Sequence, residues 1–226
     1  MSDGGQPGDL SRRALLGRVS AAGAFVALTE VLPPGTSVAD APQTRRSPAR
    51  GPLEALTPAE AVTLEAIAAR LIPTGPDGPG AAEAGAAIYI DRALAGALAN
   101  FRDAYRAGLA SVDAYARGAK RAPFAQLSAA DQDTVLADME RNTATGFEGG
   151  SASFFALVLA HTVQGTFCDP FYGGNRNFAG WDLIAYPGVR LAVTADQQNL
   201  DAKPAATHMS GYDYSMFSGR KPAHGH

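Results

Sequence analysis

TPAEAVTLEAIAARL, residues 57–71, is the stretch that decides the fold class. Thr57 suits a helix N-cap, Pro58 suits the first helical turn, and Glu60 lies where a capping box requires an acidic side chain. The apolar residues that follow recur at three- and four-residue steps, namely Leu64, Ile67, Ala68 and Leu71. This pattern predicts an amphipathic helix that ends before Pro73.

Four further stretches downstream have similar helical spacing. They run from about 81 to 99, 101 to 119, 128 to 139 and 152 to 164. Ser128 with Asp131 repeats the capping pattern, with Asp in place of Glu. No segment shows the apolar–polar alternation of a half-buried strand. The sequence therefore predicts an all-α domain, a small helical bundle of about five helices closed by a long, irregular C-terminal segment rich in Gly and aromatic residues.

The composition of the 226-residue chain excludes several classes of protein. With 46% hydrophobic and 18% charged residues, the chain has enough apolar side chains for a core. A formal net charge of −3 argues against a nucleic-acid binder, which needs clustered Lys and Arg. The single cysteine, Cys168, excludes an internal disulfide, a CxxCH haem site and an iron–sulfur cluster held by this chain alone. We therefore expect no cofactor in this chain.

The N-terminal 39 residues resemble a twin-arginine export signal. Arg12 and Arg13 precede a short apolar run, residues 19–28, which is shorter than the roughly 20 apolar residues that span a membrane. Small residues predict cleavage after Ala39, with cleavage after Ala41 as the second choice. The alternative interpretation is an amphipathic N-terminal helix of a cytosolic protein. The export signal, which we favour, predicts a periplasmic protein.

The rest of the chain divides by composition into three parts. Residues 40–55 are rich in Pro, Arg and Ala, which predicts a flexible linker. Residues 56–190 contain the helical stretches and form the predicted domain, and residues 191–226 form a C-terminal tail with scattered Met, Tyr and His. Two interpretations of the tail stay open: it docks on a partner, or it is disordered.

Aromatic residues are concentrated about threefold between Phe154 and Tyr186, where eight of the chain's eighteen lie in 33 positions. The centre of this region reads FCDPFYGGNRNFAGW, residues 167–181. Its glycines permit tight turns, and its Asp and Asn side chains can bond to nearby backbone groups. We therefore expect a loop that is rigid without being regular. Its Trp, Tyr and Arg are the residue types that dominate binding hot spots.

Six side chains of this loop are candidate partner contacts: Cys168, Asp169, Tyr172, Asn175, Arg176 and Trp181. Cys168 either fills a buried site or forms an intermolecular disulfide. Asp169 before Pro170 favours a turn over a general base. Arg176 suits a clamp on a partner or on local carbonyls better than a site for a substrate carboxylate. For Trp181, an interface anchor and a core position stay equally open.

Several motifs together resemble the signature of the gluconate 2-dehydrogenase subunit 3 family. The motifs are HT at 161–162, CDP at 168–170, YGGNR at 172–176, GW at 180–181 and YPG at 186–188. Fragments upstream fit as well, namely LIPT at 71–74, GPGA at 78–81 and YID at 89–91. The resemblance covers roughly residues 56–190, and the motifs within residues 172–181 are specific.

The resemblance implies a non-catalytic small subunit of a membrane-associated dehydrogenase complex. In such complexes a large FAD-dependent flavoprotein of the glucose–methanol–choline type oxidises a sugar, sugar acid or polyol, and a multihaem cytochrome c subunit passes electrons on. The small subunit carries the signal for the twin-arginine translocase and escorts the folded flavoprotein. FAD and haem c are thus expected in partner chains.

Two rival functions stay open from the residues alone. The first is a self-contained enzyme that uses Asp169, Arg176 and His161, although His161 among apolar neighbours is better explained as a structural residue. The second is a free periplasmic sugar-binding module, in which Tyr172 and Trp181 stack on the ligand.

Overall fold

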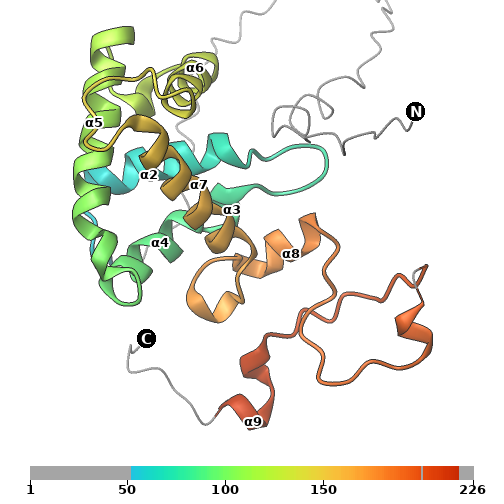
Figure 1. Cartoon of the computed structure of the whole chain (residues 1–226). Coiled ribbons are helices and arrows are strands. Elements are labelled where there is room, and N and C mark those ends of the chain that lie inside the picture. Colours follow the sequence, from blue (N-terminus) through green and yellow to red (C-terminus); the bar gives the residue numbers. More distant parts are fainter. Residues whose placement is uncertain (1–51, 200, 219–226) are drawn as a thin grey trace, which may run out of the picture. The chain divides into compact units, whose positions relative to one another are not determined.

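The computed structural model describes residues 52–199 and 201–218, and in these ranges the fold is all-α, without a strand (Figure 1). The predicted export signal with Arg12 and Arg13 lies outside the described residues. The α-helices are α2 (Pro58–Leu71), α3 (Ala81–Ala84), α4 (Ala86–Ala95), α5 (Arg102–Lys120), α6 (Ala129–Glu140), α7 (Ser151–Phe167), α8 (Ala179–Leu183) and α9 (Ser215–Ser218). The predicted all-α class is confirmed. No described helix is long and apolar enough to cross a membrane.

Short 3-10 turns connect or extend these helices in the loops. They are η1 (Ala99–Phe101), η2 (Phe124–Gln126), η3 (Pro170–Tyr172), η4 (Arg176–Phe178), η5 (Asp196–Gln198) and η6 (Gly211–Asp213). Four of the six follow α7, so the C-terminal segment has local structure without long helices.

The capping signals that the sequence predicts are present. The Thr57 hydroxyl accepts a 3.3 Å hydrogen bond from the amide of Glu60, whose carboxylate accepts a 2.7 Å bond from the Thr57 amide. Ser128 caps α6 in a similar way, by accepting a 3.2 Å bond from the amide of Asp131. Both helices therefore begin where the sequence predicts, because the side chains satisfy amides that would otherwise lack partners.

The stretch from 81 to 99 differs from the predicted single helix. Gly85 adopts a left-handed conformation with φ of 74° and separates α3 from α4. A Cβ at this position would lie 2.5 Å from Cδ of Arg176. The chain turns here because glycine tolerates both the positive φ and the close approach of the Arg176 side chain. The prediction of one continuous helix is wrong for this tertiary reason.

Helix α7 occupies the middle of the helical domain (Figure 1) and contacts α2, α3, α4, α5, α6 and α8. Its Phe154 and Val158 pack into a core to which the other long helices contribute at helical spacing. The larger buried residues of this core are Leu64, Ile67, Ile90, Leu94, Tyr105, Leu109, Val112, Phe124, Val135 and Met139. The loop after α7 therefore starts from the most firmly held helix.

One buried carboxylate fixes the segment that precedes α2. Asp91 on α4 is 2% exposed and accepts hydrogen bonds of 2.8, 3.0 and 2.8 Å from the amides of Glu54, Ala55 and Leu56. A carboxylate that accepts several backbone bonds offsets the cost of its burial. Asp91 thereby holds the segment before α2 against α4.

Candidate functional site

The candidate site is the loop that follows α7, residues 168–189, which contains all six candidate partner contacts. It begins with Asp169, whose carboxylate accepts a 3.0 Å hydrogen bond from the amide of Phe171 and so caps η3. This geometry agrees with the turn-forming role that the sequence favours for Asp169.

Asn175 is fully buried, and its side chain forms hydrogen bonds that join distant parts of the loop. Its amide nitrogen donates a 2.8 Å bond to the carbonyl of Cys168, and its Oδ1 accepts a 2.8 Å bond from the amide of Gly180. The same oxygen accepts a 3.3 Å bond from the amide of Trp181. One side chain thus connects the two ends of the loop. Because Asn175 is enclosed, its expected role as a partner contact is corrected to a positioning role.

Two glycines let the loop lie directly against the backbone of α7. A Cβ on Gly174 would be 2.0 Å from the carbonyl oxygen of Gly165, and one on Gly180 would be 1.9 Å from that of Thr166. No side chain fits at these distances. The loop is therefore rigid through close backbone packing together with the Asn175 bonds, as the sequence leads us to expect.

Trp181 belongs to the interior of the loop. It is 4% exposed, and its indole nitrogen donates a 3.0 Å hydrogen bond to the carbonyl of Phe167. Tyr186 packs edge-on against the indole with ring centroids 4.9 Å apart. Of the two interpretations for Trp181, the structure favours core packing, because a buried indole cannot anchor a partner or stack on a sugar.

Tyr172 and Arg176 are two candidate contacts whose side chains reach the surface. Tyr172 is 50% exposed. Arg176 is half-buried, with its aliphatic part against Gly85, and its guanidinium makes no hydrogen bond or ion pair with any described residue. A partly desolvated guanidinium without a partner is available to a carboxylate or phosphate from another molecule.

The C-terminal tail folds back onto the loop. Ser210 donates a 2.7 Å hydrogen bond to the Asp169 carboxylate, and the amide of Gly211 donates one of 2.8 Å. The hydroxyls of Tyr172 and Tyr212 are 2.8 Å apart, and the Tyr212 ring stacks on Phe171 with centroids separated by 3.6 Å. The described part of the tail therefore docks on its own domain, a contact that sequence reasoning missed.

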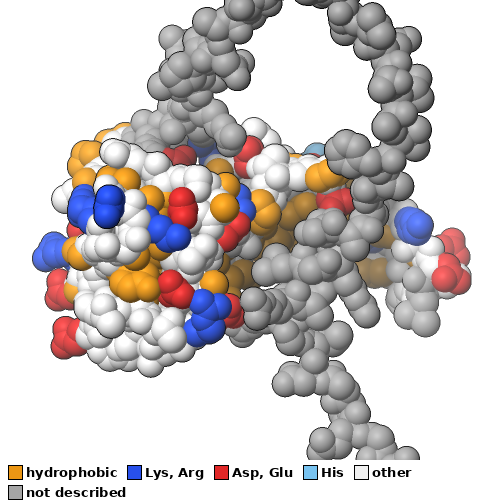
Figure 2. Space-filling view, turned by 90° about the horizontal axis from the view of Figure 1, so that it is seen from above, with side chains coloured by type: hydrophobic (Ala, Val, Ile, Leu, Met, Phe, Trp, Pro, Cys, Tyr) orange, Lys and Arg blue, Asp and Glu red, His pale blue; other side chains and the backbone are white. Residues whose placement is uncertain are grey.

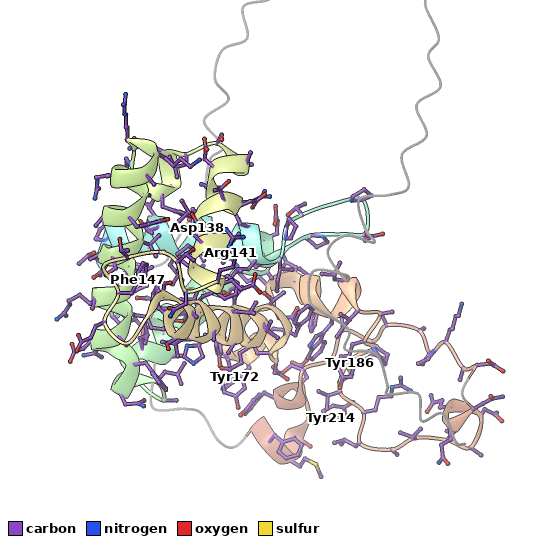
Figure 3. The ribbon with its side chains drawn as sticks, turned by 45° about the horizontal axis from the view of Figure 1, so that its top comes forward. Asp138, Arg141, Phe147, Tyr172, Tyr186 and Tyr214 are labelled. Atoms are coloured by element: carbon purple, nitrogen blue, oxygen red, sulfur yellow. The ribbon has the colours of Figure 1, made fainter. Side chains whose placement is uncertain are left out.

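The tail forms a second group of contacts near α8. His208 Nε2 lies 2.7 Å from Oδ1 of Asp182, and its ring stacks on Phe178 with centroids 4.8 Å apart. The amide of Thr207 donates a 2.7 Å hydrogen bond to the carbonyl of Pro187. Figure 3 shows Tyr172, Tyr186 and Tyr214 on the side of α7 away from Asp138 and Arg141.

His161 lies inside the core and away from the loop surface. It is 5% exposed, its Nδ1 lies 3.0 Å from the Tyr105 hydroxyl, and Phe101 contacts its ring edge-on. Burial lowers the pKa of its imidazole below the usual value. The structure does not bring His161 together with Asp169 and Arg176 at an accessible site, which argues against the self-contained enzyme.

Cys168 is partly buried at the C-terminus of α7. Its Sγ lies 3.6 Å from the carbonyl oxygen of Gly165. Burial raises the pKa of the thiol to about 11, a shift that the backbone amide of Gly174 partly opposes. The thiol is therefore a poor nucleophile in the isolated chain at neutral pH.

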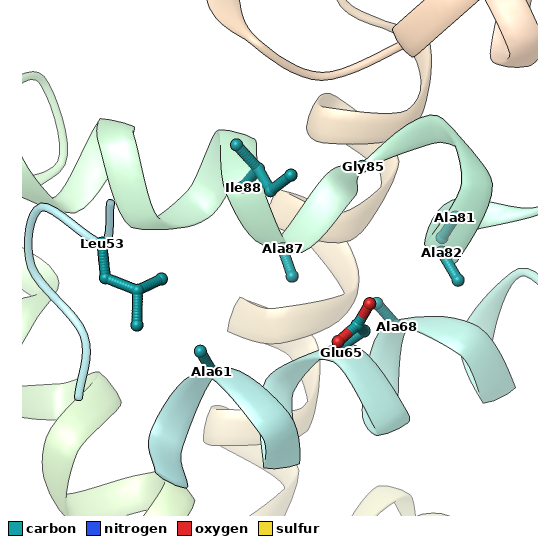
Figure 4. Close-up of a pocket in the computed structure, with 9 residues that line it drawn as sticks. All are labelled: Leu53, Ala61, Glu65, Ala68, Ala81, Ala82, Gly85, Ala87 and Ile88. Carbon is teal, nitrogen blue, oxygen red and sulfur yellow. The ribbon is translucent and has the colours of Figure 1, made fainter. Parts of the chain in front are cut away.

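A small hollow between α2 and the α3–α4 segment has an apolar lining (Figure 4). Leu53, Ile88 and several alanines line it, with Glu65 at its edge. None of the six candidate loop residues lines this hollow. Among the described residues, no cluster of three His, Cys, Asp or Glu side chains could hold a metal ion.

Comparisons with known proteins identify the family. No curated protein and no solved structure matches the chain. The family model described as gluconate 2-dehydrogenase subunit 3 matches residues 58–188, from the start of α2 to the penultimate residue of the candidate loop. The match covers more than half of the chain, so this protein belongs to the gluconate 2-dehydrogenase subunit 3 family and is an accessory subunit of an oxidoreductase.

Proposed function

We propose that this chain is the non-catalytic small subunit of a periplasmic, FAD-dependent dehydrogenase that oxidises a sugar, sugar acid or polyol. In this proposal the chain escorts its folded flavoprotein partner, of the glucose–methanol–choline type, through the twin-arginine route and stabilises it after export. FAD is bound by the flavoprotein, and a multihaem cytochrome c subunit, where present, accepts the electrons.

One observation carries the proposal: the match to a family of dehydrogenase subunits lies downstream of Arg12 and Arg13 in the same chain. The twin-arginine route exports folded proteins, so a partner that carries no signal of its own can leave the cytoplasm bound to a chain that has one. The exposed Tyr172 and the guanidinium of Arg176, which pairs with no described residue, support a binding role for the loop.

The experiment that tests the escort function uses the signal itself. The chain is co-expressed with the flavoprotein encoded beside it, either as wild type or with Arg12→Lys and Arg13→Lys. We expect the double variant to hold both chains and the dehydrogenase activity in the cytoplasm. Arg18→Lys, a change of the same kind outside the arginine pair, is the matched control and should leave export intact.

The distribution of the flavoprotein decides the outcome. If it reaches the periplasm and is active there with the double variant, shared export is wrong. Loss of flavoprotein stability when the small subunit is deleted, measured from its cytoplasmic half-life, separately tests the stabilising role.

A further inference from the structure

Exposed apolar side chains are concentrated at the C-terminal side of the described chain. Among the described residues, ten large hydrophobic side chains are exposed, and eight of them lie between residues 171 and 217. Four fall within ten consecutive residues, which we name the apolar segment: Ile184, Tyr186, Leu191 and Val193 are 56, 39, 52 and 50% exposed. Single exposed apolar residues are ordinary, whereas such a concentration is typical of an interaction surface.

The backbone of the apolar segment is held by the rest of the chain. The amide of Tyr186 donates a 2.8 Å hydrogen bond to the carbonyl of Trp181, and the amide of Val189 donates one of 2.9 Å to that of Met209. The hydroxyl of Tyr214 donates a 2.7 Å bond to the Val189 carbonyl. The loop and the tail thus hold residues 186–189 of this segment from both sides. A surface fixed in advance loses little conformational entropy on binding.

The exposed area is close to what a stable interface needs. A large side chain that is half exposed offers roughly 80–100 Å², so the four side chains offer roughly 320–400 Å², and Met216 and Phe217 raise the total to roughly 480–600 Å². A standard interface buries about 800 Å² per partner, of which somewhat more than half is apolar. The summed exposed area of the six side chains therefore matches the apolar part of one standard interface. Seen from above, hydrophobic side chains lie among Lys, Arg, Asp and Glu on the described surface of the molecule (Figure 2).

We propose that the apolar segment, with Met216 and Phe217, is the surface that packs against an uncharged, apolar face of the flavoprotein subunit. The proposal rests on the proposed function, since it requires that partner. It assigns the main contact to residues 184–193 and to the end of the tail, and it gives the buried Asn175 and Trp181 the task of holding that contact in place.

Charge substitutions test this surface directly. The full chain is co-expressed with an affinity-tagged copy of the flavoprotein encoded beside it, and the amount of small subunit captured is measured. We expect Leu191→Glu with Val193→Glu to lower capture by about tenfold or more, because two carboxylates would be desolvated against an apolar face. Val62→Glu with Val163→Glu is the matched control: these valines are 46 and 43% exposed on α2 and α7. Circular dichroism and thermal unfolding verify that both variants fold.

Each outcome has a defined meaning. Capture of the control but not of the apolar-segment variant supports the proposal, and equal capture of both overturns it while leaving the proposed function intact. If the wild-type chain is not captured at all, the proposed function fails and this surface fails with it.

Two further measurements test whether the apolar segment instead binds a second copy of this chain or a lipid surface. Sedimentation of the isolated chain as a dimer that Leu191→Glu with Val193→Glu dissociates would assign the segment to self-association. Flotation of the isolated chain with phosphatidylcholine or phosphatidylglycerol vesicles, lost in the same variant, would assign it to a lipid surface. Either result overturns the proposal.

Discussion

The carboxylate of Asp169 accepts a 2.7 Å hydrogen bond from the hydroxyl of Ser210, which lies 41 residues further along the chain. The amide of Gly211 adds a 2.8 Å bond to the other carboxylate oxygen. Because the family match ends at residue 188, this contact joins the family domain to a segment outside the match. Asp169 therefore caps its own turn and fastens the tail with one side chain.

Replacing Asp169 should release the tail while the helical domain stays folded. Asp169→Ala removes three hydrogen bonds to a carboxylate, and bonds of this kind contribute about 1.5–3 kcal/mol each when a charged group takes part. We expect hydrogen exchange at the Gly211 amide to accelerate at least about tenfold. The exposed Asp196 provides the control, since Asp196→Ala should not change this rate. Unchanged exchange in Asp169→Ala would show that the tail is held by other contacts.

The fold and the rigid loop follow from local sequence, whereas the tail contact does not. The capping residues and helical spacing predict α2 and α6, because both signals act within one or two turns. The break at Gly85 depends on Arg176, 91 positions away in the sequence, and no local pattern contains that information. The same limit applies to Ser210, whose partner is far away along the chain.

Burial explains the other differences between the expected and the observed site. Trp181 has the residue type of a hot spot and Asn175 lies in the same loop, but both side chains also satisfy buried backbone groups. Composition cannot distinguish the two uses. The hydrogen bonds of the Asn175 side chain to the backbone of Cys168 and Gly180 form only in the folded loop, so the sequence does not reveal them.

Asp91 should contribute strongly to stability. Asp91→Ala leaves three buried or partly buried amides without their acceptor, so we expect the free energy of unfolding to fall by about 2–4 kcal/mol. Asp91→Asn keeps one acceptor oxygen and should cost less. Asp103→Ala, at a side chain that is 95% exposed, is the control and should change stability by less than about 0.5 kcal/mol. Urea unfolding measures all three. Equal stability of Asp91→Ala and wild type would contradict the buried anchor.

His161 should make the fold sensitive to mild acid. Its pKa is lower in the folded chain than the ordinary 6.5, because burial disfavours the imidazolium. The unfolded chain therefore binds the proton more readily, and the stabilising effect is complete above pH 6.5 and is lost as pH falls through the folded-state pKa. We expect His161→Gln to have a flatter stability profile below pH 6.5 than wild type. Parallel profiles for the two proteins would rule out this contribution.

The Cys168 thiol should react slowly in the isolated chain. With a pKa of about 11 against an ordinary 9.0, the thiol has about 100-fold less thiolate at pH 8 than a free cysteine. Alkylation by iodoacetamide should accelerate about tenfold per pH unit until pH approaches 11. The chain unfolded in urea is the control and should react at the rate of a free thiol. Equal rates in the folded and unfolded chain would contradict the burial of Cys168.

A non-reducing gel of the oxidised complex tests the second interpretation of Cys168. An intermolecular disulfide gives a mixed band that reduction or Cys168→Ser abolishes. A complex that runs as separate chains without reductant excludes this disulfide and leaves Cys168 as a buried filler.

The substitution Gly180→Ala tests how closely the loop packs against α7. A methyl group at this position would be 1.9 Å from the carbonyl oxygen of Thr166, so Gly180→Ala must displace the loop, at a cost of about 2–3 kcal/mol. Gly118 on α5 is the matched control, because a Cβ there meets nothing within 4 Å. Gly118→Ala should stabilise the chain by about 0.5–1 kcal/mol through helix propensity.

Replacement by alanine thus lowers the free energy of unfolding at Gly180 and raises it at Gly118. Urea unfolding should show a difference of about 3 kcal/mol between the two variants. Since the displaced loop also carries the hydrogen bond from Tyr186 to Trp181, Gly180→Ala should weaken capture by the flavoprotein as well. Gly118→Ala should leave capture unchanged. A stable Gly180→Ala variant with normal capture would show that the apolar segment does not depend on the contact between the loop and α7.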